Sequence, residues 1–315
     1  MKAYKELAEL DASGRVVTIG KFDGIHLGHQ ALIKAAVETA DRLGLLSTVV
    51  TFDRNPSAVL AGESERQDLV GPNQKTKLIE QLGCSEMLEL CFDEELSKET
   101  ATTFIQRVLV DSLNTNHLVV GKDFRFGHQG AGNVELLQAV GARSGFQVTV
   151  IEPVMQGGSA VSSTRIRNLP NAGDVNEAAK LLGRNHATTG LVEHGLKIGR
   201  QLGFPTANLS RSSEGYLPKD AVYAGWLIDG QNRYPAALSV GVNETIQAVP
   251  RLIEAHVLDR KDLDLYDREV TVEYVDFIRD SAKFASVEEL IEAINRDLEA
   301  IRMRLDSANP QQTHR

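Results

Sequence analysis

The stretch GKFDGIHLGH, residues 20–29, stands between two segments that differ in their apolar pattern. The five residues before it, RVVTI, form a short β-branched run that predicts a buried strand. Residues 29–43 after it carry apolar side chains at helical spacing and predict a helix. A glycine-rich connection between a strand and a helix lets the backbone approach a ligand closely, and free amides at a helix start favour anions. The stretch therefore predicts the first strand–helix unit of an α/β fold, with an anion-binding turn.

Strand and helix signals go on alternating up to residue 151. Strands are predicted at 47–52, 87–92, 117–120 and 147–151, and helices at 75–82, 101–113 and 135–142. Helices of this length between strands are typical of crossover connections, which make a parallel sheet with helices on both faces. In such sheets, ligands bind at the carboxyl ends of the strands. The first part is thus predicted to be a doubly wound parallel sheet.

The pattern changes after about Gly183. Five strand-like segments follow with no long helix between them, at 188–192, 222–228, 234–240, 253–258 and 270–277. Closely spaced strands of this kind indicate a small antiparallel barrel. A final helix is predicted over 287–305, because apolar residues recur on one face.

Length and composition describe an ordinary globular protein. The 315 residues suggest two domains at about 150 residues each. The chain is 42% hydrophobic and has no apolar run near the roughly 18 residues that a membrane span needs. Because the N-terminus also lacks the apolar core of a signal peptide, we expect a cytoplasmic protein with no membrane partner. Cys84 and Cys91 are too few for a disulfide scaffold or a zinc cage.

The net charge of -9 is spread evenly along the chain. Residues 1–190 hold 19 basic and 23 acidic residues, and the remainder holds 15 and 20. No basic half or tail predicts a nucleic acid partner. A phosphate-bearing ligand must therefore bind at a local site.

His26 and His29 stand three residues apart at the predicted helix start. Two imidazoles beside free amides suit a triphosphate without a surplus of lysine. A plain glycine-rich turn with incidental histidines is the simpler alternative. A metal site is a weaker one, because no third ligand lies nearby in the sequence.

This motif resembles the H-x-G-H signature of nucleotidylyltransferases. With Phe-Asp-Gly ahead of the histidines, it is similar to the bacterial bifunctional riboflavin kinase/FMN adenylyltransferases, also called FAD synthetases. Three further blocks of that family appear in order: TFDRNP at 51–56, VVGKDFRFG at 119–127 and VSSTRIR at 161–167. The resemblance implies a Rossmann-like nucleotidyltransferase domain that transfers AMP from ATP to FMN, with His26 and His29 as catalytic residues. It further implies an ATP site of Gly20, Phe22, Asp23, Gly24, Ser163, Thr164 and Arg167, and a flavin site of Phe52, Asp123 and Phe126.

Each of these blocks also has a simpler explanation. The hydroxyls of 162–164 and the guanidinium of Arg167 suit phosphate, but a helix N-cap with solvated arginines would have the same residue types. Asp123 could orient a polar edge of the flavin or merely form a turn. Phe52 and Phe126 could pack on the isoalloxazine ring or belong to the core.

The second strong motif is GFPTAN, residues 203–208, which resembles the P-T-A-N signature of riboflavin kinases. Upstream, Gly195 and the pair at 199–200 resemble the glycine-containing flap of that family. Thr206 and Asn208 face the same way in an extended segment, and their oxygens suit Mg²⁺ that carries nucleotide phosphates. A polar loop with one proline is the alternative.

Glu254 is the one acid in the apolar strand segment of 253–258. The resemblance to the block that contains the catalytic glutamate of riboflavin kinases makes it the general base for the ribityl hydroxyl. A surface-facing strand glutamate is the alternative that spacing alone leaves open.

The chain departs from the family pattern at several positions. Asn55 stands where histidine is frequent, and NETI at 243–246 stands where Asn-Pro-Thr-Phe is usual, with the new acid Glu244. Ala221 and Asp267 replace glycines. These changes put the efficiency of the kinase in doubt.

The predicted function is therefore twofold: riboflavin plus ATP gives FMN, and FMN plus ATP gives FAD. We place the adenylyltransferase domain at 1–184 and the riboflavin kinase domain at 185–315. Expected partners are riboflavin, FMN, FAD, ATP and Mg²⁺, with the oligomeric state open. The nearest rival function keeps only the adenylyltransferase, with the barrel as a flavin-binding or regulatory module. An RNA-binding protein with a small barrel is a third alternative, disfavoured by the even acidity.

Overall fold

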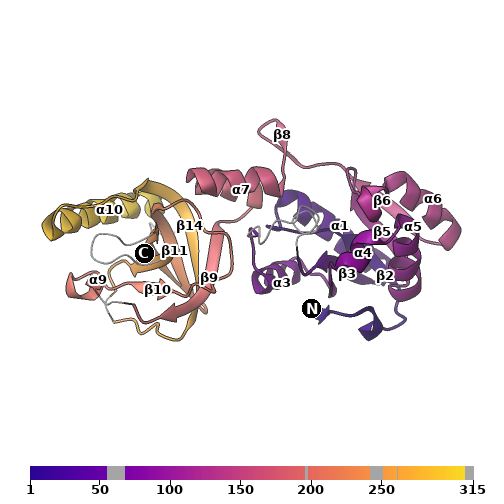
Figure 1. Cartoon of the computed structure of the whole chain (residues 1–315), viewed down its shortest axis with the longest axis horizontal. Helices are drawn as coiled ribbons and strands as arrows, with labels where there is room; N and C mark the ends of the chain where they lie inside the picture. Colours follow the sequence, from indigo (N-terminus) through magenta and orange to yellow (C-terminus); the bar gives the residue numbers. More distant parts are fainter. Residues whose placement is uncertain (55–67, 196–197, 242–250, 261, 309–315) are drawn as a thin grey trace. The chain divides into compact units, whose positions relative to one another are not determined.

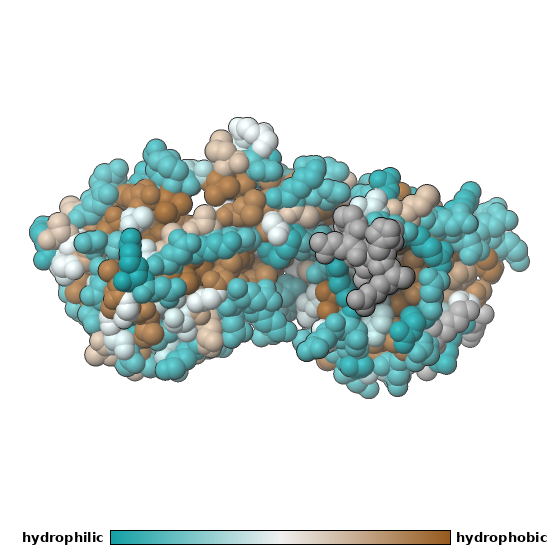
Figure 2. Space-filling view, turned by 180° about the vertical axis from the view of Figure 1, so that it is seen from behind, coloured by the Kyte–Doolittle hydropathy of each residue, from teal (hydrophilic) through white to brown (hydrophobic). Residues whose placement is uncertain are grey.

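The computed structural model describes residues 1–54, 68–195, 198–241, 251–260 and 262–308. The described chain divides into two compact units, Met1–Ser162 and Ser163–Arg315 (Figure 1). Figure 2 shows hydrophilic side chains spread over the visible face of each unit, with apolar ones between them. Within the described residues, no helix is both long and apolar enough to cross a membrane.

The first unit is built on a parallel sheet of six strands in the order β1-β4-β3-β2-β5-β6. The strands are β1 Lys2–Tyr4, β2 Arg15–Ile19, β3 Leu46–Phe52, β4 Glu86–Leu90, β5 Thr115–Gly121 and β6 Gln147–Ile151. The order steps from β2 to β3 and β4 on one side and to β5 and β6 on the other. This reversal at β2 confirms the doubly wound sheet that the sequence predicts.

Helices cover both faces of this sheet. The helical segments are η1 Leu7–Glu9, α1 Leu27–Leu43, α3 Pro72–Gln81, α4 Glu94–Lys98, α5 Ala101–Phe104, η2 Ile105–Ser112, η3 His128–Gly130 and α6 Val134–Ser144. On one face, Val17 and Ile19 of β2 pack with α5, η2 and α6. On the other face, Val49 of β3 packs with Ile33 of α1 and Ile79 of α3. A hairpin of β7 Met155–Gln156 and β8 Ser159–Ala160 ends the unit.

The helix predicted at 101–113 differs in one respect from the expectation. It is a short α-helix, α5, that continues as the π-helix η2. The wider π turn still places Ile105, Val108 and Leu109 in the core. The apolar spacing therefore indicates the helix but not its type.

The second unit opens with two helices and continues as a closed six-stranded barrel in the order β10-β13-β12-β11-β14-β9. All barrel pairs are antiparallel, which confirms the second predicted architecture. Its elements are α7 Ser163–Ala172, α8 Val175–Leu182, β9 His186–Glu193, α9 Ile198–Gln201, β10 Ala207–Leu209, β11 Ala221–Asp229, β12 Asn232–Gly241, β13 Leu252–Val257, β14 Glu269–Asp280 and α10 Val287–Ala308.

The barrel has separate inner and outer apolar layers. Its interior is filled by side chains such as Tyr223, Leu227 and Leu238, all fully buried. The C-terminal helix α10 packs on the outside, where Leu298 and Ile301 join Trp226 of β11. The barrel is therefore a packed core and not an open channel.

Candidate active sites

The loop after β2 is held in a constrained backbone shape. Phe22 and Ile25 have φ of 51° and 40°, the left-handed region that side chains other than glycine rarely adopt. The side chains of Phe22 and Ile25 are both buried, and Gly24 between them has φ 85°. Burial of Phe22 and Ile25 over-determines this shape, as is typical of strained segments at functional sites.

His26 is the N-cap of α1. Its Nδ1 accepts a hydrogen bond from the backbone N–H of His29 at 3.3 Å. The two imidazole rings stack, with centroids 3.6 Å apart and planes 17° apart. A Cβ on Gly28 would stand 3.1 Å from Cε1 of His26. The glycine of the motif therefore leaves the space in which the His26 ring stacks on His29.

His29 is a neutral imidazole in this environment. Burial lowers its pKa well below the ordinary value, and the charges of His26, Lys21 and Lys75 lower it further. Its Nδ1 is enclosed and has no hydrogen-bond partner among the described residues. The edge of Phe22 contacts the same ring, with centroids 5.2 Å apart. The ring is thus held in place with an unsatisfied nitrogen, which suits binding of an anion through an N–H bond.

Asp23 is fully buried and ties the loop to the segment before α3. Its Oδ1 accepts the backbone N–H of Leu69 at 2.7 Å, and its Oδ2 lies 3.7 Å from Nζ of Lys21. Lys21 also pairs with Asp68 at 3.4 Å. These contacts of Asp23 hold the loop against the segment before α3.

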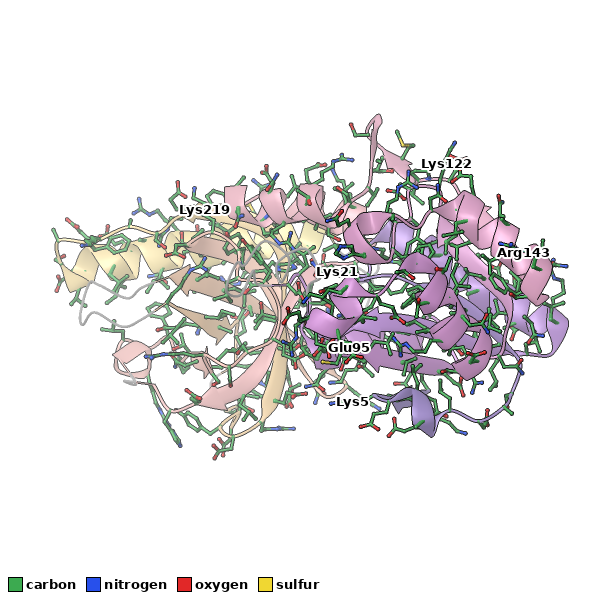
Figure 3. The ribbon with its side chains drawn as sticks, turned by 45° about the vertical axis from the view of Figure 1, so that its right-hand side comes forward. Lys5, Lys21, Glu95, Lys122, Arg143 and Lys219 are labelled. Atoms are coloured by element: carbon green, nitrogen blue, oxygen red, sulfur yellow. The ribbon has the colours of Figure 1, made fainter. Side chains whose placement is uncertain are left out.

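The predicted flavin residues follow the carboxyl ends of two strands that flank β2. Phe52 ends β3, while Asp123 and Phe126 follow β5, so all three lie at the sheet edge that also carries the loop after β2. Lys21 and Lys122, labelled in Figure 3, mark the loops after β2 and β5. Asp123 is exposed at this edge.

Both phenylalanines have aromatic neighbours of their own. Phe52 meets Phe92 edge-on, with centroids 5.5 Å apart. Phe126 stacks on Phe124 at 5.4 Å and is half-buried. Each ring keeps part of its surface open, so packing in the loop and contact with a planar ligand are compatible.

The predicted phosphate block begins the second unit. α7 starts at Ser163, as its N-cap-like sequence predicts, and Thr164 is exposed in its first turn. Arg167 is one turn further and only 6% exposed. The block therefore presents hydroxyls at a helix start with a buried guanidinium behind them.

Glu254 points away from the barrel interior. Its strand neighbours Ile253 and Ala255 fill the interior, whereas Glu254 and His256 border a cavity of 740 Å³. Helix α10 forms another wall of this cavity, through Leu290, Ile294, Asp297 and Leu298. The strand glutamate thus lines a cavity and is half-buried, not fully exposed.

Thr206 and Asn208 stand beside this carboxylate. Asn208 pairs with Glu254 across β10 and β13, and Thr206 lines the same cavity as the carboxylate. Burial raises the pKa of the Glu254 carboxyl, and Thr206 acts in the opposite direction. A Cβ on Gly195 would come within 2.6 Å of Nδ2 of Asn208, so the flap approaches Asn208 as only glycine allows.

A second cavity of 690 Å³ lies next to the first. Gly195, Thr206 and Asn208 border both cavities, and Tyr266 borders the second one. The three shared residues therefore separate two chambers, each large enough for a small-molecule substrate.

Comparison with known proteins identifies the family of this chain. Residues 8–165 match the family described as FAD synthetase, and residues 182–305 match the family described as riboflavin kinase. A bifunctional riboflavin kinase/FMN adenylyltransferase of Pseudomonas fluorescens is 39% identical over 291 residues, which are 92% of each chain. The chain belongs to the bifunctional riboflavin kinase/FMN adenylyltransferase family.

Two further proteins are similar to this chain over nearly its whole length. The family member of Escherichia coli K12 is 33% identical over 298 residues, covering 94% of this chain and 95% of the relative. A crystal structure from Streptococcus pneumoniae, described as a macrolide-efflux protein, has a TM-score of 0.84 and 31% identity. It covers 95% of this chain and 98% of its own. The resemblance drawn from the motifs and the predicted fold class are both confirmed.

The departures from the family pattern fall into two groups. Ala221 is buried in the barrel interior and does not line the cavity beside Glu254, although its neighbours Asp220 and Val222 do. Asp267 is exposed with φ 59°, a left-handed position where glycine costs nothing and aspartate is tolerated. Asn55 and residues 243–246 lie outside the described residues.

Two residues near the sites escape the sequence analysis. His256 donates a hydrogen bond from its Nδ1–H to the carbonyl of Pro205 at 2.8 Å, and its ring meets Phe204. This fixes the loop that carries Thr206. Lys75 on α3 is only 5% exposed. The sequence signals the burial of Lys75 in only one way: Lys75 stands four residues before the apolar Ile79, which puts both on one face of a helix.

Proposed function

We propose that this chain makes FAD from riboflavin in two ATP-dependent steps. In the first, the ribityl hydroxyl oxygen of riboflavin bonds to the γ-phosphorus of ATP, and ADP leaves. In the second, a phosphate oxygen of FMN bonds to the α-phosphorus of another ATP, and pyrophosphate leaves. The observation that carries the proposal is that the two halves of one chain match an FAD synthetase and a riboflavin kinase, each with its own polar site.

Glu254 is assigned as the base of the kinase step. A carboxylate with a raised pKa in an enclosed cavity takes a proton better than an ordinary exposed one. Thr206 lines the same cavity as the carboxylate, and Asn208 stands opposite on the next strand. These three side chains orient the hydroxyl and the phosphate for direct transfer.

Thr206, Asn208 and Glu254 also suit Mg²⁺. Hydroxyl, amide and carboxylate oxygens are the hard donors that this ion prefers; Asn208 and Glu254 lie opposite each other on paired strands, and Thr206 directly precedes β10. When bound, Mg²⁺ would neutralise charge on the nucleotide phosphates. We propose Thr206 and Asn208 as the residues of this chain that hold it.

His26 and His29 are assigned to the adenylyl transfer. Adenylyl transfer requires mainly positioning and stabilisation of charge on the phosphates. Stacking and the N-cap bond hold both imidazoles at a helix start, where free amides add to the field. Because His29 is neutral before ATP arrives, it acts first as a hydrogen-bond donor.

The remaining assignments rest on the family motifs. Arg167, with Ser163, would hold the leaving pyrophosphate. The other proposed ATP residues are Gly20, Phe22, Asp23, Gly24 and Thr164, and the proposed flavin residues are Phe52, Asp123 and Phe126. The division into 1–184 and 185–315 and the cytoplasmic location remain predictions from the sequence.

A product-resolved assay tests the proposal. The chain is incubated with ATP and Mg²⁺ plus either riboflavin or FMN, and the flavins are separated chromatographically. We expect FMN and FAD from riboflavin, and FAD from FMN. His29→Ala should abolish FAD formation and leave FMN formation largely intact, whereas Glu254→Gln should do the reverse by orders of magnitude.

The same assay decides against the proposal if the products differ. FAD from FMN with no product from riboflavin would establish the rival function, an adenylyltransferase with a flavin-binding or regulatory barrel. Equal loss of both activities in His29→Ala would refute the assignment of separate sites.

A further inference from the structure

Lys75 is a buried cation with no partner in the described part of the chain. Its side chain is 5% exposed, yet it makes no ion pair and no side-chain hydrogen bond to any described residue. The nearby acids are engaged elsewhere, since Asp23 and Asp68 both face Lys21. A lysine whose side chain is almost wholly covered and finds no acid is rare unless it has a ligand.

The fold places Lys75 beside the loop that carries the two histidines. Ile79, one helical turn later on the same face of α3, packs in one cluster with Phe22 and Ile25 of that loop. The N–H of Leu69, just before α3, is bonded to Asp23 of the same loop. The N-terminal turn of α3 and the loop are therefore fixed against each other at two points.

The site beside Lys75 has an unsatisfied polar group. The start of α1 follows the same loop, and the enclosed Nδ1 of His29 has no hydrogen-bond partner among the described residues. The positive charge of Lys75 is one of the causes that lower the pKa of His29. A multiply charged anion would complete this cluster, because it would pair with the ammonium and accept bonds from the imidazole and the amides.

We propose that Lys75 binds a phosphate of ATP in the adenylyl-transfer site, an inference that rests on the proposed function of the first unit. The ammonium would then supply the local positive charge that an acidic protein cannot supply in bulk.

The test compares Lys75→Met with Lys77→Met. Methionine keeps the apolar stem and removes the charge, and Lys77 is an exposed lysine two residues along the same helix. For Lys75→Met we expect at least a tenfold fall in kcat/KM for ATP in FAD formation from FMN, with riboflavin phosphorylation unchanged. The thermal midpoint without ligand should stay the same or rise. Lys75→Arg should recover part of the loss, and Lys77→Met should resemble the wild type.

Binding of inorganic pyrophosphate provides a readout that is independent of turnover. Calorimetric titration should give a clear affinity for the wild type and for Lys77→Met, and at least tenfold weaker binding for Lys75→Met. Absence of FAD formation in the wild type would refute the proposed function, while the pyrophosphate titration would still test Lys75. Wild-type pyrophosphate affinity in Lys75→Met, or a lowered thermal midpoint with loss of both activities, would overturn the proposal.

Discussion

Gly28→Ala should separate the stability of the first unit from its adenylyl transfer. The added Cβ would stand 3.1 Å from Cε1 and 3.2 Å from Nδ1 of His26, closer than most side-chain contacts. The ring must give way by a few tenths of an ångström, which weakens both its stack on His29 and its 3.3 Å N-cap bond. Loss of the cap costs about 1 kcal/mol, and alanine in place of glycine returns up to about 1 kcal/mol of helix propensity. The net change in unfolding free energy should therefore be near zero.

Catalysis should respond more strongly than stability. A displacement of about 1 Å costs about a hundredfold in rate, so a shift of a few tenths predicts about a tenfold loss of kcat for FAD formation. The assay follows FAD formation from FMN and FMN formation from riboflavin in the same preparation, and the second activity is the internal control. A double-mutant cycle with His26→Ala isolates the mechanism. If Gly28→Ala lowers the rate equally in the wild type and in the His26→Ala background, the reasoning through His26 is refuted.

Three more predictions concern the second unit. As the pH falls, the rate of riboflavin phosphorylation should decline with a midpoint above the ordinary pKa of glutamate, because burial raises the pKa of Glu254. Thr206→Val should move that midpoint to a still higher pH, because Thr206 lowers this pKa. An unmoved midpoint would argue against an effect of Thr206 on Glu254. Burial lowers the pKa of His186 to about 4 in the folded state, so the unfolded chain takes up the proton first and stability is lost as the pH falls from 6.5 towards 4. That loss should reach about 2 kcal/mol at pH 5, and His186→Asn should show a shallower pH dependence in denaturant titrations unless another group controls it. Gly195→Ala should lower kinase kcat by about tenfold or more without changing FAD formation from FMN, because its Cβ would collide with Asn208 at 2.6 Å; a wild-type kinase rate would show that the flap can move aside.

Most of the fold follows from apolar periodicity. The strands β2 and β6 begin and end where the sequence predicts them, because β-branched runs bounded by glycine or polar residues leave little choice. The strands β1 and β10 are only three residues long and show no alternation that could be detected. They form because neighbouring strands pair with them, and this pairing cannot be read from the short segments themselves.

The motifs predict which residues form the sites but not how they are held. The sequence indicates His26 and His29, yet the ring stack and the space that Gly28 leaves for it appear only in three dimensions. Lys75 lies outside the motif positions, and His256 lies within the block of Glu254 but has no role assigned from the sequence; both act across packed elements. Such long-range contacts have no local pattern, so the sequence could not have shown them.

The wall between the two chambers of the barrel has a consequence for kinetics. Gly195, Thr206 and Asn208 border both cavities. With ATP in one chamber and riboflavin in the other, a phosphoryl group would pass across this wall directly from donor to acceptor, so both substrates must be bound at once. Initial-rate lines at several fixed ATP concentrations should therefore intersect, as in a ternary-complex mechanism, and parallel lines would indicate a phosphorylated enzyme instead.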